Sequence, residues 1–518
     1  MFESVQIFGS LPISIFLVLI AVASDVAFRA FYNLSWHPAA KFPGPWYCAV
    51  SSLPLSIISV LRVEPQWLLS LAKKYKNQPI RISPSMLFFP QSSALKAIYC
   101  DPELNQRKAS LYGTGILGPP HLFTTLDGDA HRVLRKALGG SHWNIGHLKN
   151  HWEDNIDDLI RLFIERLTES AERKETVGLG DRSAWFAADV MSMLSFGEPW
   201  GFVRNNRDER GILRSWRQGL DFFGFVGRFK FFQKNIMTLP GIGTLFLPKT
   251  TDAGGMGWLI NQAITQVETR TRQLAVKGHE GKKDYMQYCL EARLNGEPLT
   301  NVQRVAHVTL LIQAGADTTG TGLGSTFRFL VSNRDKLERA AAEIEAAEKA
   351  GKLSTPAKYE EVRQHLPYVV ACTKEGLRLN PPATNLLGRV TPREGATIDG
   401  HYVPAGLDVT SYPYVVHRDT EFYGPDAEMF RPERWLESEP PTKLDSNAFV
   451  FGMGARACLG KDIAIMEMYK LVTEVVRNFD LELVNEGKFV VAGGVAYNRD
   501  FSVTVARKTA TIGTVNSE

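Results

Sequence analysis

Paired cysteines are missing from this sequence. Its 518 residues include only five cysteines, at positions 48, 100, 289, 372 and 458, and none forms a C-x-x-C pair. An odd, scattered set argues against a disulfide framework and against a cysteine zinc site. The zinc-protease pattern H-E-x-x-H is also absent among the 11 histidines. We therefore expect a protein of a reducing compartment whose chemistry does not depend on zinc.

The sequence also lacks a strong charge bias and internal linkers. Lysine and arginine number 59 against 55 acidic residues, a net charge of +4, so no nucleic-acid partner is indicated. No Pro/Ser/Gly-rich stretch divides the chain behind its N-terminus, and we found no repeats. Residues 129–330 show mostly helical patterns, while 78–100 and 501–505 resemble strands. The prediction is one large domain, mainly α with small β-sheets (α+β).

An apolar segment without charges covers residues 7–24 and is long enough to cross a bilayer as a helix, despite Pro12. No Lys or Arg precedes it, whereas Arg29 and Lys41 follow, so the positive-inside rule places the rest of the chain in the cytosol. A cleavable signal peptide is the competing interpretation, because residues 21–23 resemble a cleavage site. The missing positive n-region and the cysteine usage favour an uncleaved anchor.

These features predict three parts of the chain. Residues 1–32 form a membrane anchor, 33–50 a proline-rich hinge, and 51–518 the catalytic domain. Prolines in the hinge restrict the backbone and give a short, stiff connection.

The ten residues 451–460, FGMGARACLG, place Cys458 directly before an amphipathic helical pattern. A thiolate there benefits from the unpaired N–H groups and the positive end of the helix dipole. Gly454 and Gly460 let the backbone approach a flat partner, and Arg456 can donate to a carboxylate. A cysteine-ligated haem needs these features. The alternative is a buried core cysteine after a Gly-rich turn.

A second pattern joins charges within apolar surroundings. Glu375 and Arg378 lie three residues apart on a predicted helix, so both project from one face. Such a pair is most often a weak surface ion pair. Here the flanking residues are apolar, and buried charges need partners, which the segment 430–435, FRPERW, can supply.

A third pattern lies in the helical segment 310–319, LLIQAGADTT. Asp317 and Thr318 stand side by side in an apolar helix interior, where both side chains compete with helix hydrogen bonding. A groove at Ala314 could hold dioxygen and relay protons to it. The alternative is a helix kink whose polar groups are satisfied locally. His307, on the same helix, is more often a packed side chain than a ligand in such a setting.

In their order along the chain, these motifs resemble those of the cytochrome P-450 family. F-x-x-G-x-R-x-C-x-G is similar to the family's haem loop, A-G-x-D-T to its oxygen-groove helix, and K-E-x-x-R with F-R-P-E-R to its Glu-Arg-Arg triad. The resemblance implies the cytochrome P-450 fold and a structural triad of Glu375, Arg378 and Arg434. It also implies Asp317 as proton-relay acid and Thr318 as the hydroxyl beside the oxygen, with adjacent Thr319 as the fallback.

The resemblance implies a haem (iron protoporphyrin IX) whose axial ligand is the Cys458 thiolate. The cofactor-binding residues that it implies are His131, Arg135, Arg389, Phe451, Gly454, Arg456 and Gly460. Two positions depart from the family's pattern: His131 replaces the usual tryptophan of W-x-x-x-R, and Gly388 replaces the usual proline before Arg389.

The implied activity is a microsomal monooxygenase, similar to those of filamentous fungi, in the endoplasmic reticulum membrane. It would insert one atom of O2 into an apolar small molecule of secondary metabolism, such as a terpenoid, polyketide or alkaloid. Electrons would come from an NADPH-cytochrome reductase, with cytochrome b5 as a second candidate donor. By analogy the substrate pocket includes Ile116, Phe123, Leu311, Ala314, Leu386 and Leu387. The aromatic stretch 219–235 either lines this pocket or packs in the core.

Two other functions remain open. A haem-thiolate isomerase, dehydratase or peroxygenase needs no reductase, and a haem sensor or binding protein performs no turnover. The Asp317–Thr318 pair favours the monooxygenase, since the non-enzymatic protein has no use for it.

Overall fold

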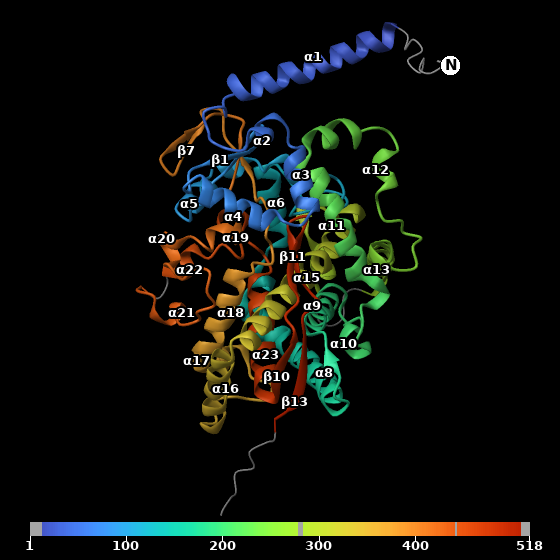
Figure 1. The fold of residues 1–518 in the computed structure, drawn as a ribbon. Helices are drawn as coiled ribbons and strands as arrows, with labels where there is room; N and C mark the ends of the chain where they lie inside the picture. Colours follow the sequence, from blue (N-terminus) through green and yellow to red (C-terminus); the bar gives the residue numbers. More distant parts are fainter. Residues whose placement is uncertain (1–12, 278–282, 441–442, 509–518) are drawn as a thin grey trace, which may run out of the picture.

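The computed structural model describes residues 13–277, 283–440 and 443–508. It is mostly helical with small separate sheets, which confirms the predicted fold class. Figure 1 shows one long helix, α15, running through the middle of the molecule with other helices around it. Our prediction for residues 7–12 of the apolar segment lies outside the described residues.

The longer helices carry most of the structure. They are α1 (Ile13–Ser35), α4 (Glu64–Lys74), α6 (Gly128–Leu138), α8 (Glu153–Glu172), α9 (Leu179–Phe196), α11 (Ile212–Arg228), α13 (Gly255–Lys277), α15 (Asn301–Ser332), α16 (Arg334–Lys349), α18 (Pro367–Leu379) and α23 (Lys461–Asn478). The shorter helices are α2 (Trp46–Val50), α3 (Leu53–Val60), α5 (Ala94–Tyr99), α7 (Ile145–His151), α10 (Phe202–Asn205), α12 (Ile242–Leu245), α14 (Tyr285–Glu291), α17 (Tyr359–His365), α19 (Pro413–Val416), α20 (Thr420–Tyr423), α21 (Arg434–Glu437) and α22 (Lys443–Asn447). Single turns are η1 (Leu104–Gln106), η2 (Ser110–Tyr112), η3 (Ser141–Trp143), η4 (Glu209–Gly211), η5 (Phe232–Ile236) and η6 (Gly454–Arg456).

Short strands form small, separate sheets. The four-stranded sheet has the order β1 (Ile80–Ser83), β2 (Met86–Phe88), β9 (Asp408–Thr410), β6 (Arg389–Val390); β2 and β9 are parallel and the other pairs antiparallel. A three-stranded sheet has the order β10 (Phe479–Asn485), β13 (Ser502–Arg507), β3 (Thr176–Val177). Two-stranded pairs are β11 (Lys488–Ala492) with β12 (Val495–Arg499), β4 (Arg293–Leu294) with β5 (Glu297–Pro298), and β7 (Ala396–Ile398) with β8 (His401–Val403).

The core is built where α15 packs closely on α9. Gly315 and Gly320 make this approach possible: a Cβ at Gly315 would lie 2.2 Å from the Met191 sulfur, and one at Gly320 would lie 2.4 Å from the Ala184 Cα. The core side chains around this contact, including Ala184, Leu323 and Phe327, are almost completely buried. Asp317 therefore lies between two glycines at which the backbone of α15 contacts α9 closely.

The N-terminal parts differ in detail from the prediction. The apolar helix α1 continues to Ser35, three residues beyond the expected anchor boundary, and its described stretch Phe16–Ser35 is long and apolar enough to cross a membrane. It lies across one end of the molecule, next to α2 (Figure 1). Asn33 at its last turn donates to the Val50 carbonyl at 3.3 Å, and the Arg81 guanidinium donates to the Asn33 carbonyl at 2.6 Å.

The hinge packs on the domain. Ala39 and Phe42 are buried in a cluster with Leu87 and Val409 of the four-stranded sheet. The residues that connect the anchor to the domain are therefore also part of the domain's packing.

Candidate functional site

The loop before α23 has a defined backbone geometry. The Cys458 N–H donates to the Phe451 carbonyl at 2.7 Å, which closes the loop. Gly454 has a φ of +66°, and a Cβ there would lie 2.0 Å from the Tyr99 carbonyl oxygen. The need for glycine at 454 thus comes from close packing against the end of α5, whereas the sequence suggested approach to a flat partner. Gly460 caps α23, which begins at Lys461.

The Cys458 side chain keeps accessible surface. Burial of the thiol by the surrounding protein raises the pKa of Cys458, and the Gly460 N–H and the charges of Arg135 and Lys461 act in the opposite direction. These groups offset only part of the effect of burial, and coordination to a metal would deprotonate the thiol.

Cationic side chains gather beside this loop. Arg456 donates to the carbonyls of Thr125 and Leu126 at 3.0 and 3.1 Å, and Arg135 donates to the Ala457 carbonyl at 2.7 Å. Arg389, at the start of β6, donates to the Asn105 side-chain oxygen at 3.1 Å.

Lys108 is a further member of the group, absent from our predictions. It is 5% exposed, and its ammonium group donates to the Phe123 carbonyl and lies 4.5 Å from the centre of the Tyr112 ring. Burial, followed by the charges of Arg456 and Arg389, holds the pKa of Lys108 well below its usual value.

Neighbouring positive charges also lower the pKa values of Arg456 and His131. Burial and then the charge of Arg389 lower the pKa of Arg456 to about 10. Burial, followed by Arg456 and Lys108, lowers the pKa of His131 to about 3, so this histidine is neutral. It lies on α6 and is 4% exposed.

This donor set fits a dianionic group such as a haem. Within the described ranges, none of the four cations forms an ion pair with a carboxylate; they are Lys108, Arg135, Arg389 and Arg456. The hydrogen bonds of these side chains go to carbonyl or amide oxygens. Buried cations without counter-charges are costly. Two propionates would supply the missing negative charge beside the loop that carries Cys458.

The structure brings the predicted triad together. Arg378 donates to both Glu375 oxygens at 2.8 Å, and Arg434 donates to one of them at 2.9 Å. Glu375 also accepts from Trp435 Nε1 at 2.9 Å and from the Arg431 N–H at 3.0 Å.

All three triad side chains are buried. Arg378 and Arg434 donate further to the carbonyls of Ala427 and Tyr423, which joins α18 to the segment 417–434. Although burial raises it, the two guanidinium groups hold the pKa of Glu375 below its usual value. The arrangement is a closed structural network with no surface for a reacting molecule.

Asp317 makes a contact that the sequence did not predict. Its carboxylate, 1% exposed, accepts from Arg217 of α11 at 2.7 and 3.1 Å. Arg217 also donates to Asp181 of α9 at 3.0 Å. Burial raises the pKa of Asp317, and the charge of Arg217 opposes this shift.

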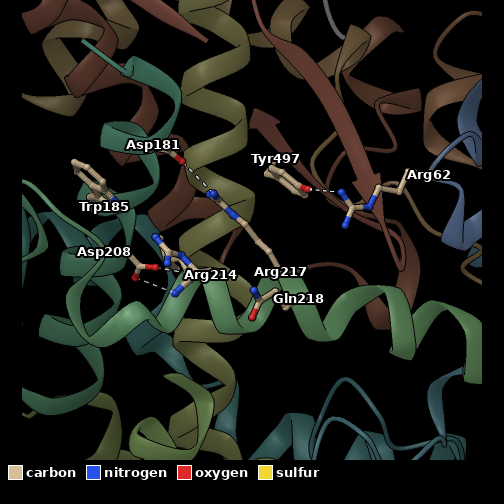
Figure 2. A pocket seen from close by; sticks show the side chains of 9 residues that line it. Arg62, Asp181, Trp185, Asp208, Arg214, Arg217, Gln218 and Tyr497 are labelled. Atoms are coloured by element: carbon tan, nitrogen blue, oxygen red, sulfur yellow. Dashed lines mark hydrogen bonds and ion pairs between the residues drawn. The ribbon is translucent and has the colours of Figure 1, made fainter. Parts of the chain in front are cut away.

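Arg217 connects Asp317 to a polar pocket of about 280 Å³. Figure 2 shows Arg217 between Asp181 and Tyr497, with Asp208 to the left and Arg62 to the right; all of these residues line the pocket. Asp181 is about half exposed and Arg217 is 19% exposed, whereas Asp317 is buried behind them. The acid of α15 therefore has a polar route to solvent through α9 and α11.

Thr318 lies on another side of α15. Neighbouring helix residues do not face each other, and the Thr318 hydroxyl donates to the Ala314 carbonyl one turn earlier. Ala314 is exposed and Thr318 half-buried, whereas Thr319 is 3% exposed. Of the two threonines, Thr318 thus has the accessible side chain. The helix stays continuous over Asn301–Ser332, so Asp317 and Thr318 do not interrupt it.

The predicted pocket residues differ in their accessibility. Ile116, Phe123, Ala314 and Leu387 keep accessible surface. Leu311 is 8% exposed, and Leu386 is fully buried in a cluster with Leu111 and Tyr412, so in this structure Leu386 offers no surface to a ligand.

His307 has both ring nitrogens occupied. One bonds to the Gln303 carbonyl at 2.7 Å, and the other accepts from the Leu122 N–H at 3.1 Å. This is the packed histidine that we favoured, and it holds the 121–123 segment against α15.

Comparison with known proteins agrees with this geometry. A model of the cytochrome P-450 family matches residues 85–491, more than half of the chain. The cytochrome P-450 monooxygenase gsfF of Penicillium aethiopicum is 32% identical over 94% of this chain and 97% of its own length. Quiannulatic acid synthase of Emericella variicolor is 29% identical over 87% and 90%, and pisatin demethylase of Fusarium vanettenii is 26% identical over 88% and 89%. The chain belongs to the cytochrome P-450 family, and it is an oxidoreductase of the haem-thiolate type.

Proposed function

We propose that this enzyme is a monooxygenase that inserts one oxygen atom of O2 into an apolar small molecule. The observation that carries the proposal is the accessible Cys458 beside a group of buried and half-buried cations that have no carboxylate partner among the described residues. A haem held by the Cys458 thiolate would supply oxygen activation, because thiolate ligation favours O–O cleavage.

Four cationic side chains would hold the propionates in this proposal. Arg456 lies on the haem loop and Arg389 at the start of β6. Lys108 precedes Asp127, the N-cap residue of α6, and Arg135 lies on α6 itself. Neutral His131 would serve as an uncharged donor. Phe451, Gly454 and Gly460 shape the loop that presents the thiolate.

Asp317 and Thr318 would supply protons. Asp317 would take protons from the polar pocket that Arg217 and Asp181 line, and burial, which raises the pKa of Asp317, favours proton uptake once Arg217 has moved away. The Thr318 hydroxyl, on the accessible side of α15 beside Ala314, would hold the oxygen by a hydrogen bond. Movement of Arg217 away from Asp317 would free the acid for transfer.

The substrate pocket that we propose is apolar where it is accessible. Ile116, Phe123, Ala314 and Leu387 present hydrocarbon surface, which suits a terpenoid, polyketide or alkaloid skeleton of secondary metabolism. An NADPH-cytochrome reductase, aided by cytochrome b5, would donate electrons at the endoplasmic reticulum membrane.

The function is tested by turnover of the full chain in microsomes with candidate apolar metabolites. We expect a product that carries one atom of labelled O2, formed only with NADPH and the reductase. Product without NADPH and reductase would identify an isomerase or peroxygenase instead. Stable thiolate-haem protein that yields no product under either regime would favour a haem-binding protein.

Lys108 offers a test of the propionate site. Lys108→Met should speed loss of haem by roughly 10–100-fold, because a hydrogen bond to a charged group contributes about 1.5–3 kcal/mol. The measurement is haem transfer to an acceptor apoprotein. Arg132→Leu is the matched control, since Arg132 is an exposed cation of α6 whose ion-pair partner among the described residues is the exposed Asp129. Equal rates for Lys108→Met and the control would contradict the assignment.

Removal of residues 1–32 tests the anchor and leaves the Asn33 contacts intact. We expect the full chain to resist alkaline extraction from membranes and the shortened chain to be extracted with its haem bound, since α1 carries the apolar span. Mass spectrometry of the intact N-terminus distinguishes the alternatives. A mature chain that begins after residue 23 would show that the segment is a cleaved signal peptide.

A further inference from the structure

A row of contacting rings follows α6, the helix that contacts the Cys458 loop, and the proposed function does not use it. We define the aromatic row as Trp143, Tyr285, His142, Tyr288 and His147. These residues come from η3, α7 and α14, which are separate in the sequence. Tyrosine and tryptophan are the side chains whose rings give up one electron most readily.

The inner end of the row is fixed to the cysteine loop through α6. Arg135 donates to the Ala457 carbonyl at 2.7 Å, and a Cβ at Gly139 would lie 3.4 Å from Leu459 Cδ1. The turn η3, which follows α6, carries the first two rings, His142 and Trp143. Both bond to the Leu138 carbonyl at the end of α6, Trp143 through Nε1 at 3.0 Å and His142 through Nε2 at 3.1 Å.

The rings follow each other at contact distances. Trp143 meets Tyr285 edge to face with centroids 5.2 Å apart, and His142 lies 5.7 Å from Trp143. His142 and Tyr288 stack with centroids 3.9 Å apart and an angle of 9° between their planes. Such pairs are ordinary stabilising contacts, but here they connect the loop to a tyrosine that is half-buried.

The outer end pairs a phenol with a base. The Tyr288 hydroxyl lies 3.4 Å from His147 Nε2. A neutral imidazole accepts a proton readily near neutral pH, whereas a phenol alone holds its proton up to about pH 10. Loss of an electron from the Tyr288 ring would therefore be accompanied by transfer of its proton to His147.

We infer that the aromatic row is a one-electron route that returns electrons to the haem-thiolate site when oxidant is not consumed by substrate, with the Tyr288–His147 pair as its outer end. The inference rests on the proposed function. Hydrogen peroxide is the oxidant, and its reduction to two water molecules takes two electrons and two protons. Tyr288 returns one electron through His142 and Trp143, and its proton moves to His147 Nε2. A thiol then gives one electron to Tyr288 and releases its proton to solvent, and His147 returns the phenol proton. A second passage returns the second electron, so that two thiols become one disulfide for each hydrogen peroxide reduced.

The test uses the full holoprotein with hydrogen peroxide and no substrate, rapidly frozen for electron paramagnetic resonance. We expect a tyrosyl radical in the unchanged protein and a severalfold loss of that signal in Tyr288→Phe. Haem bleaching by peroxide should become severalfold faster in the same variant. Phenylalanine keeps the stack on His142, so a merely structural role for Tyr288 would leave both readouts unchanged.

Two further variants define the route. His147→Gln keeps a hydrogen-bond acceptor but removes the base. Trp143→Phe keeps an aromatic ring, but phenylalanine is much harder to oxidise than tryptophan. Each variant should lower the radical yield severalfold. Tyr402→Phe is the control, because Tyr402 is an exposed tyrosine of the β7–β8 hairpin.

The outcomes separate this inference from the proposed function. A normal thiolate-haem spectrum with no radical in the unchanged protein, or with a radical that survives in Tyr288→Phe, would overturn the inference alone. Protein that binds no haem would instead overturn the proposed function.

Discussion

Replacement of Glu375 by alanine is expected to abolish recovery of the haem-loaded protein. The change leaves Arg378 and Arg434 buried without their shared carboxylate and removes the acceptor of Trp435 and of the Arg431 N–H. Breaking a buried ion pair in this way costs about 3–5 kcal/mol. That is a large part of the about 5–15 kcal/mol by which a typical domain is stable.

The measurements for Glu375→Ala are the thermal unfolding midpoint and the haem-to-protein ratio after purification. Glu338→Ala is the control, since Glu338 forms an exposed pair with Arg334, and its effect should stay within about 0.5 kcal/mol. A Glu375→Ala protein with normal haem content and an unchanged midpoint would show that the triad does not support the fold.

The triad also predicts a pH dependence. Because the folded-state pKa of Glu375 lies below its unfolded value, its contribution to stability is present above the unfolded pKa. That contribution is lost as the pH falls through the folded pKa. Acid unfolding of the unchanged protein should therefore release haem in the range below the ordinary glutamate pKa of about 4.3.

Asp317→Asn is expected to give the second-largest effect. Loss of a positioned acid that transfers protons lowers the rate by roughly 10²–10⁴-fold. Asparagine has a similar size and can still accept from Arg217, so the fold should be retained. The measurement is product formed per NADPH consumed. We expect NADPH consumption to continue in part while the oxygen appears as hydrogen peroxide.

Arg217 provides a matched variant for Asp317. Arg217→Leu leaves Asp317 buried without its cation, which should raise the pKa of that carboxyl further and shift the pH profile of product formation upward. Asp181→Asn removes only the half-exposed partner of Arg217 and should change the profile little. Asp317→Asn protein with a normal product-to-NADPH ratio would remove Asp317 from proton delivery.

Local sequence rules predicted the elements whose geometry is set by near neighbours. The i, i+3 spacing of Glu375 and Arg378 put both side chains on one face of α18, and their apolar flanks indicated burial. Arg434 was identified from its motif, and the structure places it 2.9 Å from Glu375. The mainly helical fold with small sheets followed from periodicity over long segments.

Contacts between distant segments were not predictable in the same way. Arg217 precedes Asp317 by 100 residues, and nothing in the pattern of α11 distinguishes it from a surface arginine. Lys108 lies in a loop, and its association with Arg456 depends on how 101–127 folds over the haem loop. The burial of Leu386 and the packing of Gly454 on Tyr99 likewise result from tertiary neighbours.

The most direct measurement of the central claim is the absorbance spectrum of the reduced protein with carbon monoxide. If Cys458 ligates a haem, the unchanged protein shows the band typical of thiolate ligation, and Cys458→Ala does not. Cys100→Ala, which alters the other exposed cysteine of the described chain, should keep the band. A thiolate band that persists in Cys458→Ala, or that disappears in Cys100→Ala, would contradict the assignment of Cys458 as the ligand.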